Sequence, residues 1–281
     1  MKIVFHKGTF FHRKSFGIII FEIVKKVVLQ LWRIWFYVVA AIPVLILFPF
    51  LVVILLFPNS YPVIFWIARN IWAPIILHGC GFYTKIKYAK PLPTGTSFVL
   101  VANHTSYIDP FVMLRVSKNP FVFVGKKELV NIPLFGYIYK RAAIMVDRSD
   151  KKSRWNVYGR ANEKLDRGYS ICIFPEVSYE DDTVFLNPFK RGAFKIAIDH
   201  QLPVVPMVFY DCKRKHPWYP RFGYPGELRV ETYPEIYPPK TMDEIEGFQG
   251  KTRSIINKGL ESDPKQRQFE AVDLEKKWSV L

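Results

Sequence analysis

The sequence predicts an α/β fold, a mixed sheet flanked by helices, with an N-terminal helical membrane-anchoring segment. Residues 34–68 contain no charged side chain, and beyond them short β-rich runs alternate with helical patterns. Half of all residues are hydrophobic, which excludes a disordered chain because enough apolar surface is present to offset the ordering entropy. We divide the chain into membrane-anchoring helices at 1–80, an α/β domain at 81–240, and a C-terminal helix and tail at 241–281.

The uncharged block is long enough to enter a bilayer, since a transmembrane helix needs about 20 apolar residues. Four prolines interrupt it, so we expect kinks or a turn near Pro58-Asn59-Ser60 instead of one straight helix. Basic residues flank it on both sides, which places both flanks and the α/β domain on the cytoplasmic face. An even number of crossings or a hairpin in one leaflet satisfies this pattern. The alternative is a buried helical hairpin in a soluble domain.

Charge and cysteine content narrow the class of protein further. The net charge of +16 suits the anionic inner leaflet of a membrane. The basic residues are scattered without a zinc-finger, RRM-like or basic-region pattern, so no nucleic-acid partner is expected. Cys80, Cys172 and Cys212 have no paired spacing, which excludes a disulfide framework and a cysteine-based metal site.

The α/β domain is predicted from its strands and helices in chain order. Six β-rich runs predict strands at 97–102, 121–124, 144–146, 170–174, 204–210 and 228–233. Helices are predicted at 153–167, which Gly168 ends, at 191–200, and near Thr241, where Thr241 and Glu244 suggest a capping box. Such alternation is typical of a sheet with helices on its faces. Residues 213–225, rich in Pro, Tyr and Trp, are predicted to form a loop without an assigned role.

A histidine and an aspartate follow the first predicted strand. Asp109 and Pro110 form a good helix start, with Asp109 as N-cap. His104 then lies in the strand-to-helix loop, where α/β folds collect catalytic side chains. From the helix start the carboxylate can reach an imidazole nitrogen, which is the arrangement of a general base and its orienting group. The alternative is a capping aspartate beside an unrelated histidine.

Residues 98–210 resemble the glycerolipid acyltransferase family, whose best-known members are lysophosphatidate acyltransferases. Asn103-His104 through Asp109 matches the first family motif, and residues 142–148 resemble the second. Phe174-Pro175-Glu176 resembles the start of the third motif, and Val205-Pro206-Met207 resembles the fourth. The chain departs from the family at Ala142, Val177 and Tyr179, where Gly, Gly and Arg are usual.

The resemblance implies an acyltransferase of phospholipid biosynthesis. His104 would remove the proton from a free hydroxyl of a lysolipid, and Asp109 would orient His104. The hydroxyl oxygen would then attack an acyl thioester, either acyl-CoA or acyl carrier protein, as co-substrate. Because the thioester is already activated, neither a metal nor a cofactor is expected. The favoured acceptor is 1-acylglycerol 3-phosphate, giving phosphatidate.

Five further residues are candidates for substrate binding. Arg148 is predicted to bind an anionic group, because its guanidinium matches phosphate geometry; its alternative is a surface ion pair. Glu176 would bind an acceptor hydroxyl or hold its own loop. Lys126 and Lys127 would attract the acceptor headgroup or the donor phosphates, or form a solvated pair. Arg191, or alternatively its neighbour Lys190, would supply the cation that is missing at Tyr179.

Two other functions stay open. Because the third motif lacks its usual Arg and acidic residues follow Tyr179, the acceptor can instead be a phosphate-free lyso-aminolipid. The rival from another class is a catalytically silent membrane protein that binds lipid. The presence of both His104 and Asp109 favours an enzyme, since binding alone does not require this pair. Membrane lipids are the expected partners in each case.

Overall fold

The computed structural model describes residues 9–146, 151–176, 186–218 and 223–265. Its centre is a seven-stranded mixed sheet in the order β1-β7-β6-β2-β5-β3-β4, with all neighbours parallel except β6 and β7. This confirms the predicted fold class. The strands are β1 (Phe82–Tyr88), β2 (Val99–Ala102), β3 (Phe121–Lys126), β4 (Ile144–Val146), β5 (Ser170–Ile173), β6 (Val204–Phe209) and β7 (Gly226–Thr232).

The six predicted strands are confirmed, and β1 was not predicted. β1 lies at the edge of the sheet and pairs with β7 alone. Its lysines at 85 and 87 are exposed and form ion pairs with Glu227 and Glu231 of β7. Charged side chains are typical of edge strands, because they oppose pairing with another chain. They also interrupt the run of apolar residues by which the other strands were predicted.

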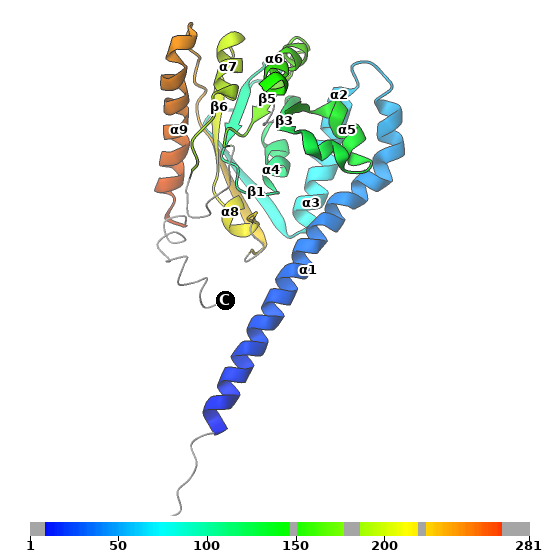
Figure 1. Ribbon diagram of the computed structural model, residues 1–281, viewed down its shortest axis with the longest axis vertical. Coiled ribbons are helices and arrows are strands. Elements are labelled where there is room, and N and C mark those ends of the chain that lie inside the picture. Colours follow the sequence, from blue (N-terminus) through cyan, green and yellow to red (C-terminus); the bar gives the residue numbers. More distant parts are fainter. Residues whose placement is uncertain (1–8, 147–150, 177–185, 219–222, 266–281) are drawn as a thin grey trace, which may run out of the picture.

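Helices cover both faces of the sheet (Figure 1). On one face lie α4 (Asp109–Val116), α3 (Ala73–Gly79) and part of α1 (Thr9–Ile54); on the other lie α6 (Lys151–Leu165), α7 (Gly192–Asp199) and α9 (Ile245–Ser262). The remaining helical elements are α2 (Tyr61–Ile67), the π-helix η1 (Ala68–Trp72), η2 (Lys127–Asn131), α5 (Phe135–Ala142), α8 (Cys212–Lys215) and η3 (Met242–Glu244).

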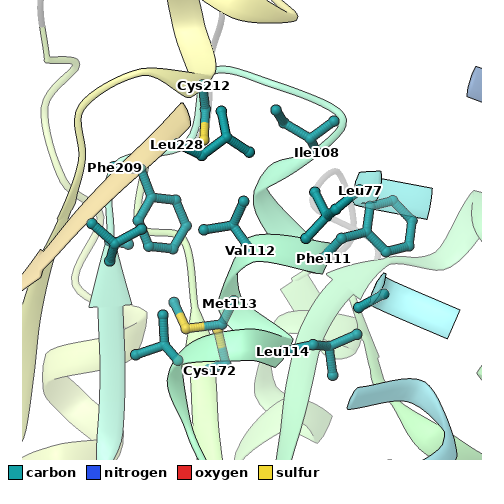
Figure 2. Close-up of a cluster of buried hydrophobic side chains, with 14 of the residues drawn as sticks. Leu77, Ile108, Phe111, Val112, Met113, Leu114, Cys172, Phe209, Cys212 and Leu228 are labelled. Atoms are coloured by element: carbon teal, nitrogen blue, oxygen red, sulfur yellow. The ribbon is translucent and has the colours of Figure 1, made fainter. Parts of the chain in front are cut away.

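The central strands divide their side chains between two hydrophobic cores. In β2, Leu100 and Ala102 belong to the core under α4, whereas Val99 and Val101 belong to the core under α7 and α9. This alternation follows from the two-residue period of a strand. Figure 2 shows the first core, where α4 packs its apolar side chains against the sheet and against Cys212. A strand buried on both faces reads as a continuous apolar run, which is why β2 was predictable.

The N-terminal region differs in part from its prediction. α1 is one helix of 46 residues that includes Pro43 and Pro49, and Figure 1 shows it bending in the half that contains them. A turn at Pro58 and Asn59 follows, so the predicted interruption of the helix near Pro58 is confirmed. α2, η1 and α3 then form the second arm of a hairpin that packs on the sheet. The division into separate domains at residues 80 and 240 remains a prediction.

The predicted capping box at Thr241 is wrong. Thr241 is the N-cap of η3, but its side chain makes no capping hydrogen bond, and α9 begins only at Ile245.

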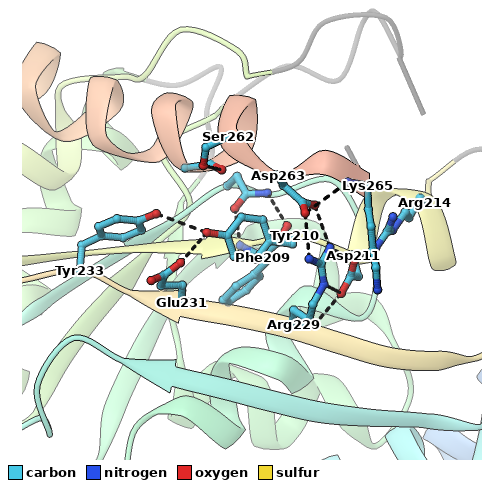
Figure 3. A network of polar contacts seen from close by, with 12 residues as sticks. Phe209, Tyr210, Asp211, Arg214, Arg229, Glu231, Tyr233, Ser262, Asp263 and Lys265 are labelled. Atoms are coloured by element: carbon cyan, nitrogen blue, oxygen red, sulfur yellow. Dashed lines mark hydrogen bonds and ion pairs between the residues drawn. The ribbon is translucent and has the colours of Figure 1, made fainter. Parts of the chain in front are cut away.

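The C-terminal end of α9 is fixed by an ion-pair network (Figure 3). In it, Arg229 of β7 binds Asp211 and Asp263 through both edges of its guanidinium. Burial alone would raise the pKa of Asp211, but the hydrogen bonds from Arg229 and the nearby arginine charges lower it below its usual value.

Replacing Arg229 with alanine is expected to lower the free energy of unfolding by about 3–5 kcal/mol at pH 7, because the buried Asp263 loses its arginine partner and the buried Asp211 keeps Arg214 but loses Arg229. The stabilisation requires ionised carboxylates whose pKa values are lowered in the fold. It is therefore complete above pH of about 4 and disappears as the pH falls further. Urea titrations should show a smaller difference from wild type at pH 3 than at pH 7, whereas an equal difference would contradict the network's role. Lys195→Ala, which breaks a half-exposed pair with Asp199, is the control and should change stability by less than about 1 kcal/mol.

Candidate active site

The site begins where β2 ends, at Asn103. The Asn103 side chain donates to the backbone oxygen of Phe209 at 3.0 Å and accepts from the Phe209 amide at 2.8 Å. These two bonds continue the β2–β6 ladder through a side chain, so they fix the direction in which the chain leaves the sheet. His104, the next residue, starts its loop from a rigid point.

His104 and Asp109 are in contact, as the sequence predicted. His104 Nδ1 lies 2.8 Å from Asp109 Oδ2, and the same oxygen accepts from the amides of Thr105 and Ser106 at 2.7 and 2.9 Å. The Asp109 side chain is fully buried, while that of His104 is 13% exposed. A carboxylate on Nδ1 favours the tautomer with its proton there, which leaves Nε2 to accept a proton from a substrate.

The prediction that Asp109 caps its helix is wrong. Ile108 occupies the N-cap position of α4, and Asp109 is the first helical residue, followed by Pro110. The carboxylate therefore turns back toward the loop before the helix and gathers three N–H donors there. The helix start is still negatively charged, which suits the positive end of its dipole.

Glu176 binds the backbone of the same loop. Its Oε1 accepts from the His104 amide at 2.8 Å, and its Oε2 accepts from the Asn187 amide and side chain at 2.8 and 3.2 Å. The side chain is completely buried, and burial raises the pKa of Glu176 although these hydrogen bonds oppose the rise. Of the two roles considered for Glu176, this geometry favours holding the loop.

Two aromatic side chains for which the sequence predicted no role enclose His104. The ring of Phe174 stacks on the imidazole with centroids 4.1 Å apart and an interplanar angle of 17°. Trp218 approaches it edge-on, with centroids 5.1 Å apart at 83°. Phe174 belongs to the third motif, but Trp218 comes from the segment 213–225. Its aromatic content was the only sequence signal, and nothing in it pointed to His104.

An apolar cavity of about 430 Å³ opens at His104. Its walls come from α1, α4, β3 and α5, with Leu47, Phe111, Phe123 and Ile138 among the lining residues. Its lining is mainly hydrophobic, and His104 and Lys126 are among its few polar members. Such a cavity suits a hydrocarbon chain, with the imidazole positioned for chemistry at one end of that chain.

The other predicted binding residues are dispersed. Lys126 ends β3 and lines the cavity, and Lys127 begins the neighbouring helix η2. Arg191 precedes α7, is exposed, and pairs with Glu246 of α9, so it is not among the residues that line the cavity. Arg148 lies outside the described residues. The structure thus brings together His104, Asp109 and Glu176, with Lys126 at the same cavity.

No group of three or more His, Cys, Asp or Glu side chains that could hold a metal ion occurs within the described ranges. All three cysteines are free and buried.

Comparison with known proteins gives consistent matches. A family model described as Acyltransferase matches residues 84–210. The chloroplastic 1-acyl-sn-glycerol-3-phosphate acyltransferase BAT2 of Brassica napus is 33% identical over 141 residues, which cover 49% of this chain and 40% of that protein. The Helicobacter pylori enzyme of the same activity is 30% identical over 153 residues, covering 53% of this chain and 65% of that protein.

The fold has a solved counterpart. The crystal structure of the 1-acyl-sn-glycerophosphate acyltransferase of Thermotoga maritima matches with a TM-score of 0.69 at 19% identity, covering 85% of this chain and 95% of that one. The chain spans between two fifths and two thirds of the lengths of the two curated relatives above. The matched residues include the His104–Asp109 pair and Glu176, and over this region the chain is similar to 1-acyl-sn-glycerol-3-phosphate acyltransferases.

Proposed function

We propose that this protein transfers a fatty acyl group from an acyl thioester to the free hydroxyl of a lysolipid, as a step of phospholipid biosynthesis. The observation that carries the proposal is the His104–Asp109 pair at an apolar cavity of about 430 Å³. A general base and a site for a hydrocarbon chain are what this reaction requires. The names of the matched relatives support the same reaction.

The reaction follows from the geometry of the pair. His104 Nε2 takes the hydroxyl proton while the hydroxyl oxygen bonds to the thioester carbonyl carbon. The carbon–sulfur bond then breaks, and the imidazolium returns the proton to the departing thiolate. Asp109 stabilises the imidazolium and keeps Nδ1 occupied, and Glu176 holds the loop through the His104 amide. A positioned base contributes about 10²–10⁴-fold.

The acceptor that we favour is 1-acylglycerol 3-phosphate, the substrate named in the matched relatives. In this proposal Lys126, at the cavity, and Arg148 interact with the anionic groups of acceptor or donor. Neither a metal nor an organic cofactor takes part, and either acyl-CoA or acyl carrier protein supplies the acyl group. A phosphate-free lyso-aminolipid is the alternative acceptor.

Mass spectrometry of the lipids formed by the purified protein tests this function. The protein is incubated with a panel of lysolipids, with and without phosphate, and with acyl-CoA or acyl carrier protein as donor. Phosphatidate formed by wild type but not by His104→Ala supports the proposal. A product only from phosphate-free lysolipids would identify the alternative acceptor. Lipid binding without any product would favour a catalytically silent lipid-binding protein.

The membrane anchor in this proposal is α1. Its residues 19–54 are long and apolar enough to cross a bilayer, and it is the one described helix that meets this condition. Figure 1 shows its N-terminal half extending away from the sheet. Apolar side chains there are exposed, Phe21 at 66% and Val28 at 58%. Farther along, Phe36 and Val39 are buried in the core, so α1 both projects from the fold and packs into it. We place the active site on the cytoplasmic face.

Exchanging Phe21, Val24 and Val28 together for glutamine should weaken membrane attachment, because each side chain is more than half exposed and makes no part of the core. Burying such side chains in lipid is worth about 1.5–3 kcal/mol each. The measurement is sedimentation of the protein with vesicles at high salt, which screens the basic residues. The double variant Tyr83→Gln/Tyr237→Gln, at exposed positions of the α/β region, is the control. Unchanged sedimentation of the triple variant would show that this part of α1 is not the anchor.

A further inference from the structure

The segment from Asp211 to Trp218 lies just beyond the residues that match the family model, which end at 210. It starts in the ion-pair network of Figure 3, where Arg229 donates three hydrogen bonds to Asp211, two from its guanidinium and one from its backbone amide. It continues through the single-turn helix α8 and ends beside His104. One end of the segment is therefore fixed to β7, and the other touches the reacting histidine.

Trp218 completes an aromatic enclosure around the imidazole. Phe174 covers one face of the His104 ring, and the Trp218 ring meets it nearly at a right angle. Trp218 also packs on Tyr107 of the same loop, with centroids 4.1 Å apart at 72°. Such edge-to-face aromatic pairs are stabilising beyond the area that they bury. The imidazole is thus restricted to the orientation in which Nδ1 faces Asp109.

Two contacts hold the backbone immediately before Trp218. The hydroxyl of Ser106, in the His104 loop, donates to the backbone oxygen of His216. From the other side, Arg33 of α1 donates to the backbone oxygen of Pro217 at 2.8 Å. Arg33 is only 6% exposed, so this bond is shielded from water. The position of Trp218 therefore depends on both the catalytic loop and the anchor helix.

The His216 side chain strengthens the connection to α1. It is completely buried, and its ring lies 5.3 Å from that of Trp32 and 4.6 Å from that of Phe36. Burial lowers the pKa of His216 to about 4, with the charge of Arg33 acting in the same direction. The imidazole is therefore neutral at physiological pH and packs as an aromatic side chain against α1.

We propose that Trp218 is a positioning residue for His104, and that Arg33 of α1 holds Trp218 in place. The inference rests on the proposed function, because acyl transfer is the reaction that the positioned base serves. Trp218 is at the cavity, but its role is to restrict the imidazole. A misplacement of a reacting group by about 1 Å can cost on the order of 10²-fold in rate.

Trp218→Ala should lower kcat by about 10–100-fold with little change in KM, since the loss is in orientation of the base. Trp218→Phe should recover most of the rate because it keeps an aromatic edge toward the imidazole. Arg33→Ala should also lower kcat. Tyr237→Ala, an aromatic residue at 70% exposure, is the matched control and should leave kcat unchanged. Wild-type kcat in Trp218→Ala would overturn the proposal.

A second measurement does not depend on acyl transfer. Diethyl pyrocarbonate modifies neutral imidazole, and peptide mass spectrometry gives the modification rate of His104 alone. Removing Trp218 should raise this rate several-fold, because the His104 side chain is only 13% exposed in wild type, and Arg33→Ala should raise it too. An unchanged rate in both variants would overturn the proposal, even if Trp218→Ala folds poorly. Should wild type show no acyl transfer, the proposed function fails while this test of Trp218 still gives an answer.

Discussion

Replacing His104 with alanine is expected to lower kcat for acyl transfer by about 10²–10⁴-fold, the contribution of a positioned general base. The alanine cannot take the hydroxyl proton, and no other described histidine lies at the cavity. The protein should stay folded, because the imidazole is partly exposed and the loop keeps its other bonds. Asp109 still accepts from the Thr105 and Ser106 amides, and Glu176 still accepts from the residue 104 amide.

The measurement is steady-state kinetics with a lysolipid and a thioester, together with thermal denaturation to verify the fold. His200→Ala is the matched control, because His200 lies at the end of α7 and contacts Asn162, away from the cavity. It should keep wild-type kcat. If His104→Ala retains more than about a hundredth of the activity, His104 is not the general base.

The sheet was largely predictable from the sequence because its strands are buried on both faces. In β2 and β6 every residue is buried, so each strand is a continuous apolar run between polar loops. β1 has the opposite pattern, with its lysines in solution at the sheet edge. Such a strand is defined by its partner β7, and single-sequence patterns do not contain that information.

The candidate site likewise contains residues that the sequence predicted and one residue, Trp218, that it did not. His104 and Asp109 are five residues apart, so a local argument could bring them together, and the family motifs supplied Glu176. Trp218 reaches His104 from 114 positions along the chain because Asp211, Ser106 and Arg33 fix its segment. Nothing in the local pattern of residues 213–225 indicates these tertiary contacts.

The first helix extends beyond the uncharged block that predicted it. Residues 34–68 form the hairpin with its turn, but α1 extends back through Lys25 and Lys26 to Thr9. Lys25 and Lys26, which were interpreted as part of a flank, are thus inside the helix. Because Phe36 and Val39 belong to the core, the hairpin is also a structural part of the α/β fold. A buried helical hairpin and a membrane anchor were considered as alternatives. α1 contributes residues to the core and is also long and apolar enough to cross a membrane.

Replacing Asp109 with asparagine is expected to lower kcat by about 10²–10⁴-fold while preserving most of the fold. Asn has nearly the same shape, but one oxygen becomes an NH₂ group that cannot accept. In wild type, Oδ2 alone accepts from the His104 ring and from two backbone amides. If the amide oxygen stays with the two backbone donors, it carries no charge to stabilise the imidazolium. If the NH₂ group faces the ring, it requires the proton on Nε2, and the base then points the wrong way.

The matched control is Asp199→Asn, which changes a half-exposed carboxylate paired with Lys195 on α7 and should leave kcat unchanged. KM for both substrates should stay close to wild type in Asp109→Asn, because the buried carboxylate touches neither of them. A loss confined to KM would place Asp109 in substrate binding, and a kcat above about a tenth of wild type would remove its role as the orienting group.

The effects of His104→Ala and Asp109→Asn on kcat should also be non-additive. Without the imidazole, Asp109 has nothing to orient, so the double variant His104→Ala/Asp109→Asn should be no slower than His104→Ala alone.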